Sequence, residues 1–442
     1  MSHNILITGA SGYLGGTLLA RLGAANLPPY GKLYALVRTD DQAKAVAQYG
    51  AKPLRFDTRD ENAIRAAVID NNITVVYYLI DAIHSTAQTS FIKALAEVKE
   101  KTGQEVHFLH TSGAKIFSSF AGAPTDRPLS DADPHLYDIQ KSQRPAIGLV
   151  QEAVNTNCTV VEQGEKHGVR SYVFTPCIVY GKREGFGNPI SIQTVAVVRA
   201  AKAAKRVYRV DTDRPMWPVC HVVDTVNLYI ELLRRILSGE NPGYGKNGYY
   251  LAASGNVAWD DLYSAMAKSL AKRSVITDDS VALADDEALE KMASALGVPK
   301  DLVALNLGGR CTFTADRAGE EADGARGARD PPPYTQAKFR RIFSSWHIYA
   351  LVVLYIGFND GNDGNLQLAY PPWLKEQGYG VKEINIYPII VEVIWQQVEA
   401  PGYPKGYPSI IALSVMLLGI AFLIRFLDNR KNKPKGRVDY GA

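Results

Sequence analysis

The sequence predicts an α/β fold with a doubly wound parallel sheet, followed by a separate helical tail. Short apolar runs typical of strands alternate with helical runs through about residues 1–315, and a glycine-rich turn joins the first strand to the first helix. Alternating apolar strands and helices indicate a parallel sheet covered on both faces. An abrupt change of composition near residue 316 separates this domain from the rest of the chain.

The first predicted strand and helix enclose the glycine turn. Residues 4–8 form an apolar strand, and residues 17–22 have a helical pattern. Between them, Gly9 allows a tight turn, Gly12 lets the backbone approach a pyrophosphate, and Gly15 lets the helix pack against the strand. The N–H groups and the positive dipole end of that helix favour phosphates. The cofactor contacts predicted from this segment are Gly9, Ser11, Gly12, Tyr13, Leu14 and Gly15.

Five more predicted strands follow the first. They lie at residues 33–37, 53–57, 74–80, 106–110 and 171–174. Helical patterns lie between them, for example at residues 61–70 and 91–101. A strand, a glycine turn and a helix at the start of such an array predict a Rossmann-type dinucleotide-binding domain. About residues 176–315 are expected to form a small substrate subdomain interleaved with the last strands of the sheet.

The end of the second strand distinguishes between the two nicotinamide dinucleotides. An acidic residue there would bind the ribose hydroxyls of NAD, whereas Arg38 suits the extra phosphate of NADP. Asp40 and Asp41 follow directly, so NAD stays possible, and Arg38 can equally be a solvated surface residue. Asp57, at the end of the third strand, is placed either to meet the adenine or to act as an ordinary turn residue.

A tyrosine and a lysine four residues apart carry the strongest chemical signal. Tyr137 and Lys141 would lie on one face of a helix, about one turn apart. A nearby ammonium favours the phenolate and would lower the tyrosine pKa toward a useful value for acid–base chemistry. The alternative is an ordinary solvated helix face, because this spacing alone is common.

Composition limits the other functions. The formal net charge is +4, and no basic stripe with interleaved aromatic residues is present in the first ~300 residues, so a nucleic-acid partner is not expected. The four cysteines are widely spaced and indicate reduced thiols rather than a disulfide framework or a zinc site. No acidic cluster indicates a metal, and the N-terminus lacks the apolar region of a secretory signal.

Taken in order, these motifs resemble the short-chain dehydrogenase/reductase superfamily over about residues 3–315, and in particular its extended or atypical branch. The chain looks like fungal members of the NAD-dependent epimerase/dehydratase family. Residues 175–181 resemble a segment that lines the nicotinamide and substrate, and residues 221–224 resemble a later element of the family.

The resemblance implies a small carbonyl or hydroxyl substrate and a nicotinamide cofactor, with hydride moving to or from the ring. It implies that Tyr137 is the general acid or base and that Lys141 lowers its pKa and holds the nicotinamide ribose. It also implies that Pro176 lies at the cofactor. A homodimer formed through two sheet-flanking helices is a further expectation of the family.

One position departs from the family pattern. Many members have a catalytic serine or threonine just after the fifth strand, where this chain has Gly113. Ser112 or Thr111 could substitute from the adjacent positions. Otherwise the hydroxyl is absent, so two hypotheses stay open: a working reductase or epimerase, and a regulator that binds NADP without turnover.

Four further residues are expected near the substrate pocket: Arg209, Arg214, Trp217 and His221. For Trp217 the alternative is a place in the core, and for His221 it is a hydrogen bond to a backbone carbonyl. No run of arginines indicates a nucleotide sugar, so the sequence does not name the substrate.

The last part of the chain does not belong to this fold. Residues 316–335 have the composition of a linker, and residues 336–442 form an apolar, aromatic tail. The run at 408–427 is long enough to be a transmembrane helix, while the run at 346–358 is marginal. Basic residues flank both runs, which predicts a membrane-bound protein whose catalytic domain is cytoplasmic.

The tail resembles fragments of a fungal major-facilitator permease of the allantoate or pantothenate type. The likeness covers residues 339–349 and 400–407 together with the last apolar run. Most helices of such a transporter are missing, so the tail cannot form a transport path. A real fusion, a decayed transporter and two genes joined in error remain alternative origins.

Overall fold

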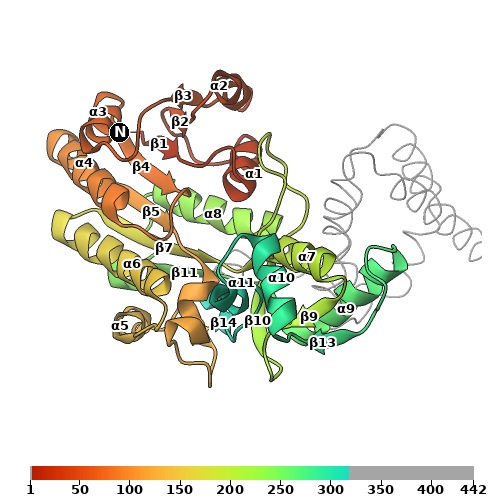
Figure 1. Ribbon diagram of the computed structural model, residues 1–442. Coiled ribbons are helices and arrows are strands. Elements are labelled where there is room, and N and C mark those ends of the chain that lie inside the picture. Colours follow the sequence, from red (N-terminus) through yellow and green to blue (C-terminus); the bar gives the residue numbers. More distant parts are fainter. Residues whose placement is uncertain (1, 318–442) are drawn as a thin grey trace, which may run out of the picture.

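Seven parallel strands form the central sheet of the protein, whose computed structural model describes residues 2–317 (Figure 1). The strand order is β11-β7-β5-β4-β1-β2-β3. The strands are β1 (Asn4–Ile7), β2 (Leu33–Leu36), β3 (Lys52–Leu54), β4 (Ile73–Tyr78), β5 (His107–Thr111), β7 (Arg170–Pro176) and β11 (Tyr249–Ala252). All six predicted strands are therefore present, and the doubly wound parallel sheet is confirmed.

Helices cover both faces of this sheet because successive strand residues point to opposite sides. Leu6 packs on one face with α3 (Glu61–Asp70), α4 (Thr86–Thr102) and α6 (Gly148–His167). Ile5 and Ile7 pack on the other face with α1 (Tyr13–Leu22), α2 (Asp40–Ala47) and α8 (Val222–Leu237). The chain reverses its direction of winding between β1 and β4, which is where ligands bind in open α/β sheets.

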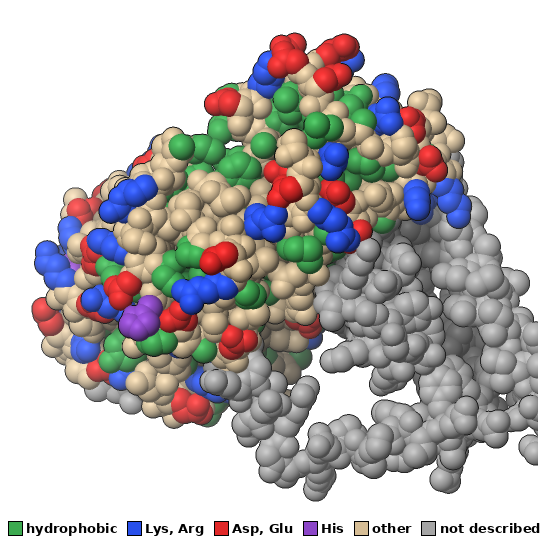
Figure 2. All heavy atoms as spheres, turned by 90° about the horizontal axis from the view of Figure 1, so that it is seen from below, with side chains coloured by type: hydrophobic (Ala, Val, Ile, Leu, Met, Phe, Trp, Pro, Cys, Tyr) green, Lys and Arg blue, Asp and Glu red, His purple; other side chains and the backbone are tan. Residues whose placement is uncertain are grey.

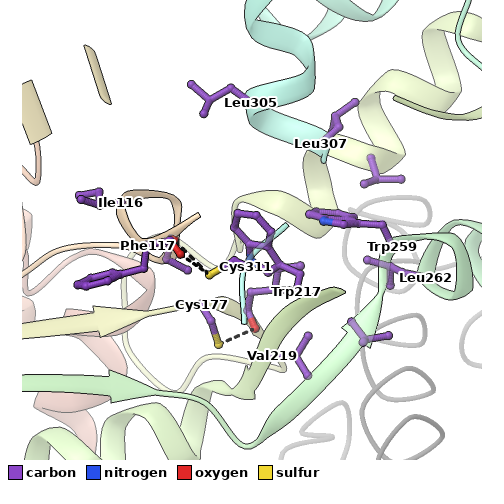
Figure 3. Close-up of a cluster of buried hydrophobic side chains, with 14 of the residues drawn as sticks. Ile116, Phe117, Cys177, Trp217, Val219, Trp259, Leu262, Leu305, Leu307 and Cys311 are labelled. Carbon is purple, nitrogen blue, oxygen red and sulfur yellow. Dashed lines mark hydrogen bonds between the residues drawn. The ribbon is translucent and has the colours of Figure 1, made fainter. Parts of the chain in front are cut away.

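The part of the domain predicted to hold the substrate, about residues 176–315, surrounds a second core and is called the substrate half below. Its strands are β8 (Ile178–Tyr180), β9 (Val207–Arg209), β10 (Met216–His221), β12 (Gly255–Ala258) and β13 (Val281–Leu283), and its helices are α7 (Gln193–Ala204), α9 (Trp259–Lys272), α10 (Asp286–Leu296) and α11 (Val303–Leu307). Trp217 and Trp259 are fully buried and lie with ring centroids 5.7 Å apart (Figure 3). Leu305 and Leu307 belong to the same cluster.

The two halves are interleaved in the sequence. α8 and β11 come after β8 and β10 along the chain, yet α8 packs on the central sheet and β11 extends it beside β7. Two short strands, β6 (Leu129–Ser130) and β14 (Phe313–Thr314), pair with each other and join residues near the end of the domain to its middle. On the face in Figure 2, basic and acidic side chains are interspersed, in keeping with the small net charge.

The predicted linker beyond residue 317 and the predicted tail lie outside the described residues. Both expected membrane runs, 346–358 and 408–427, are in that part of the chain. Within residues 2–317, no helix combines the length and apolar content needed to cross a membrane.

Candidate dinucleotide and catalytic site

The glycine turn lies at the carboxyl end of β1 and has the geometry that close packing requires. Gly9 has a φ of +70°, which favours glycine, and the Gly12 amide donates to the Gly9 carbonyl over 2.8 Å. A Cβ on Gly15 would lie 2.4 Å from the Gly9 carbonyl oxygen, so a larger residue there would displace α1. The turn and the helix can pack this closely because these positions are glycine.

The start of α1 suits an anionic group. Gly12 is the N-cap of the helix, no side chain caps it, and the first turn contains no acidic residue. The N-terminus of a helix binds phosphates through its backbone N–H groups and its dipole. A pyrophosphate therefore fits the chemistry that this turn presents.

Residues 181–188, which we call the strap, run from the end of β8 back along α1. The Asn188 amide donates to the Ser11 carbonyl over 2.8 Å, and the Tyr13 hydroxyl donates to the Gly181 carbonyl over 2.5 Å. A Cβ on Gly187 would lie 1.9 Å from the Ser11 carbonyl oxygen. The strap thus brings the substrate half into backbone contact with the glycine turn.

The ends of β2 and β3 place Arg38 and Asp57 at the carboxyl edge of the sheet, as predicted. Arg38 is exposed, and its amide donates to the Gln42 side chain. Asp40, whose proximity argued against NADP, is paired with Arg55. Asp57 forms an exposed ion pair with Arg59 over 2.8 Å, and this hydrogen-bonded arginine lowers the pKa of Asp57.

The hydroxyls after β5 differ in their availability. The Thr111 hydroxyl lies 2.7 Å from that of Tyr229 and is held by it. Ser112 is buried, and its hydroxyl has no hydrogen-bond partner among residues 2–317. A Cβ on Gly113 would meet no atom within 4 Å. Of the two candidate substitutes, Ser112 is therefore the one whose hydroxyl makes no hydrogen bond in the described residues, although that hydroxyl is fully buried.

The structure does not bring Tyr137 and Lys141 to the glycine turn. They lie on α5 (Leu136–Ser142), and both donate to Glu162, Tyr137 over 2.8 Å. Glu162 lies in the last third of α6, the helix that leads into β7. Lys246, just before β11, lies 5.2 Å from the Tyr137 ring centroid. Because both strands begin there, the pair lies at the amino edge of the sheet, away from α1 (Figure 1).

The expected pKa of Tyr137 is corrected as well. Burial and the hydrogen bond to Glu162 raise the pKa of Tyr137, whereas the sequence predicted that Lys141 would lower it. Lys141 has the ordinary solvated position that was the alternative, with a side chain 54% exposed. Its ammonium binds the Glu162 carboxylate, so its charge does not stabilise a Tyr137 phenolate.

The loop after β4 holds polar residues that the sequence analysis did not single out. Asp81 and His84 lie three and six residues after the end of β4, and His84 lies between Asp81 and Glu152 of α6. Residues that follow a parallel strand lie at the ligand-binding edge of the sheet, so their position in the sequence could have identified Asp81 and His84 as candidates. No sequence pattern links them to Glu152, which is distant along the chain.

Lys115 is a second residue that the sequence analysis did not assign. It lies in a short 3-10 helix, η1 (Ala114–Phe117), three residues after Ser112. Burial lowers the pKa of Lys115 to about 8. Lys115 is thus a largely buried cation close in sequence to Ser112.

The residues expected around the cofactor and substrate differ in where the structure places them. Pro176 ends β7 at the carboxyl edge of the sheet. Trp217 is in the core, and His221 caps α8 by accepting from the Val223 amide rather than by donating to a carbonyl. Arg214 pairs with Asp261 over 2.6 Å. Arg209 lies 3.8 Å from Asp260.

Fold and glycine turn together define a dinucleotide-binding α/β domain. A family model described as the NAD dependent epimerase/dehydratase family matches residues 5–244, more than half of the chain. The chain therefore belongs to this family of nicotinamide-dependent epimerases, dehydratases and oxidoreductases, and the resemblance drawn from the motifs is confirmed.

Individual relatives are distant. The oxidase ucsJ of Acremonium sp is 22% identical over 295 residues, which cover 62% of this chain and 81% of that protein. Among solved structures, dTDP-glucose 4,6-dehydratase from Bacillus anthracis in complex with NAD is 11% identical, covers 73% of this chain and 91% of its own, and has a TM-score of 0.49.

Vestitone reductase from alfalfa is 16% identical, covers 74% of this chain and 94% of its own, and has a TM-score of 0.45. These structural likenesses concern the fold alone. The comparisons do not support the likeness of the tail to a permease.

Proposed function

We propose that this protein is an NADP-preferring oxidoreductase or epimerase/dehydratase that acts on a small carbonyl or hydroxyl substrate. The observation that carries the proposal is the uncapped N-terminus of α1 behind the glycine turn, at the carboxyl edge between β1 and β4. A bound nicotinamide would supply or accept a hydride.

The preference for NADP rests on Arg38. Arg38 is exposed at the end of β2. The nearby Asp40 is paired with Arg55, so it repels the extra phosphate of NADP less than an unpaired aspartate would. Arginine binds phosphate through charge-assisted hydrogen bonds, which contribute about 1.5–3 kcal/mol each. NAD remains the second candidate cofactor.

Titration of the full chain with NADPH and NADH, followed by nicotinamide fluorescence, tests this proposal. We expect the Arg38→Asp variant to lose affinity for NADPH by about 10–100-fold and to keep its affinity for NADH within a few-fold. Lys44→Asp makes the same charge change on exposed α2 and serves as the control. An unchanged ratio of the two affinities in Arg38→Asp would remove Arg38 from the site, and no binding of either dinucleotide would contradict the proposed function.

A regulator that binds the dinucleotide without turnover is the second candidate. The position of Tyr137 and Lys141 at the amino edge and the glycine at position 113 favour it. Incubation of the full chain with NADPH and a panel of carbonyl compounds distinguishes the two. Consumption of NADPH with any compound supports the enzyme, whereas binding without consumption supports the regulator.

A further inference from the structure

The loop after β4 lies directly against the glycine turn. The Thr8 hydroxyl accepts from the Leu79 amide over 2.9 Å, and a Cβ on Gly9 would lie 3.0 Å from the Leu79 carbonyl oxygen. The ligand crevice of a doubly wound sheet lies where the winding reverses, which is between β1 and β4 in this sheet. The start of this loop is therefore next to the position of a bound dinucleotide, and its later residues follow at the same carboxyl edge of the sheet.

Within the loop, Asp81 orients His84. One carboxylate oxygen of Asp81 accepts from the His84 amide over 3.1 Å, and the other lies 2.8 Å from the His84 Nδ1. The Thr156 hydroxyl of α6 donates to the Ile83 carbonyl over 2.5 Å and fixes the loop to that helix. The His84 imidazole is thus held through Nδ1. The loop that carries it is hydrogen-bonded to Thr8 at its start and to Thr156 of α6 at Ile83.

The other ring nitrogen of His84 remains available. Nε2 lies 3.8 Å from a carboxylate oxygen of Glu152, which is beyond hydrogen-bond range, and the side chain is 58% exposed. In the described part of the chain, the charged groups that act on this imidazole are Asp81 on its own loop and Glu152 on α6. The hydrogen bond to Asp81, together with these negative charges, raises the pKa of His84.

We propose that His84 is the proton donor and acceptor of this site, with Asp81 as its positioning residue through Nδ1. In the direction of reduction, a hydride adds to the carbonyl carbon and the Nε2 proton moves to the carbonyl oxygen, so that C=O becomes CH–OH. A bound reduced nicotinamide supplies the hydride and is thereby oxidised. The neutral imidazole then regains a proton from water. This inference rests on the proposed function.

An ordinary surface ion pair is the alternative, and the chain contains a matched example. His135 and Asp138 have the same i, i+3 spacing as Asp81 and His84, with the order reversed, and their side chains are 77% and 70% exposed. His135 is the N-cap of α5 and Asp138 lies in its first turn, away from the glycine turn. His135 is therefore the internal control for His84.

Proton NMR titration of the histidine ring protons in the full chain tests the position of His84 without a substrate. His84→Gln and His135→Gln assign the two resonances. We expect the pKa of His84 to be lower with saturating NADP⁺ than with saturating NADPH, by on the order of half a pH unit, because only the oxidised ring is positively charged. The ring-proton resonances of His135 should not differ between the two forms.

Each outcome separates this inference from the proposed function. If neither dinucleotide binds, the proposed function fails. If both bind and the His84 pKa is the same in the two forms, His84 is not beside the nicotinamide and the inference alone is overturned. With a substrate that is turned over, we expect His84→Gln to lower kcat by about 10²–10⁴-fold and His135→Gln to leave it within about 2-fold; equal rates of the two variants would also overturn the inference.

Discussion

Helix α6 carries two polar clusters, one near each end, that differ in what they can do. Near its start, Glu152 faces His84 and Asp81 at the carboxyl edge of the sheet. Near its end, Glu162 binds Tyr137 and Lys141 at the amino edge. Ten residues of helix, about 15 Å, separate the two glutamates. Similar side chains on the same helix thus differ in whether they can take part in a reaction at the cofactor, because only the carboxyl edge of the sheet meets the glycine turn.

The two clusters show what the spacing of residues in a sequence can and cannot predict about a site. The spacing of four positions from Tyr137 to Lys141 correctly places them on one helix face, since both donate to one carboxylate. That spacing carries no information about which edge of the sheet the helix approaches. The edge depends on packing against α6 and on η3 (Gly245–Asn247), which come later in the chain.

The largest difference between the clusters should appear when the carboxylate partner is neutralised. Asp81→Asn keeps a side-chain oxygen for the loop amides but removes the charge beside His84, so the His84 pKa should fall toward its ordinary value. We expect kcat with a substrate that is turned over to fall by about 10–100-fold. Glu162→Gln is the control at the other end of α6. Equal losses in the two variants would show that the carboxyl-edge cluster has no special role.

A smaller effect is expected at the amino edge. Tyr137→Phe removes the hydroxyl that donates to Glu162, and we expect a loss of about 0.5–1.5 kcal/mol in the free energy of unfolding, measured with urea. Because Tyr137 lies away from the glycine turn, kcat should stay within about 3-fold and the affinity for NADPH should be unchanged. A loss of turnover with normal binding would instead restore the catalytic role that the sequence predicted.

The smallest effect concerns stability and pH. The folded pKa of His84 is raised above its ordinary value of 6.5, so the stabilisation by its ion pairs is complete below that value and is lost as pH rises through the folded pKa. The folded pKa of Asp81 is lowered from 3.8, so its contribution is lost as pH falls through that lower value.

The gap in urea midpoint between the native protein and His84→Gln should accordingly be larger near about pH 5.5 than near about pH 9. His135→Gln is the matched comparison again, since its pair is longer and more exposed. If the difference in urea midpoint between the native protein and His84→Gln is the same at both pH values, a charged His84 imidazole does not stabilise the fold.

Much of the fold could be predicted because its causes are local. Apolar runs and the glycines at positions 9, 12 and 15 determine strands, turn and helix over short stretches, and all six expected strands formed. β11 was not predicted, since residues 249–252 join the sheet only after a long excursion through the substrate half. The availability of Ser112 and the engagement of Thr111 by Tyr229 also depend on partners far along the chain.

In the candidate site, too, local features were predictable and contacts between distant parts of the chain were not. Arg38 and Asp57 lie where their strands end, which the order of strands alone implies. Glu152 could not be linked to His84 from sequence, because their proximity arises from the packing of α6 beside the β4 loop.

The strap has a kinetic consequence. The Asn188 amide and the backbone at Gly187 rest on Ser11, so the segment that leads into the substrate half is hydrogen-bonded to the turn that would cradle the phosphates. Exchange of one dinucleotide for another then requires these contacts to open, which would lengthen the residence time of the cofactor relative to that of a substrate. Deuterium uptake at the Asn188 amide reports that opening directly, and slower uptake in the presence of NADPH would show that the strap closes over its own ligand.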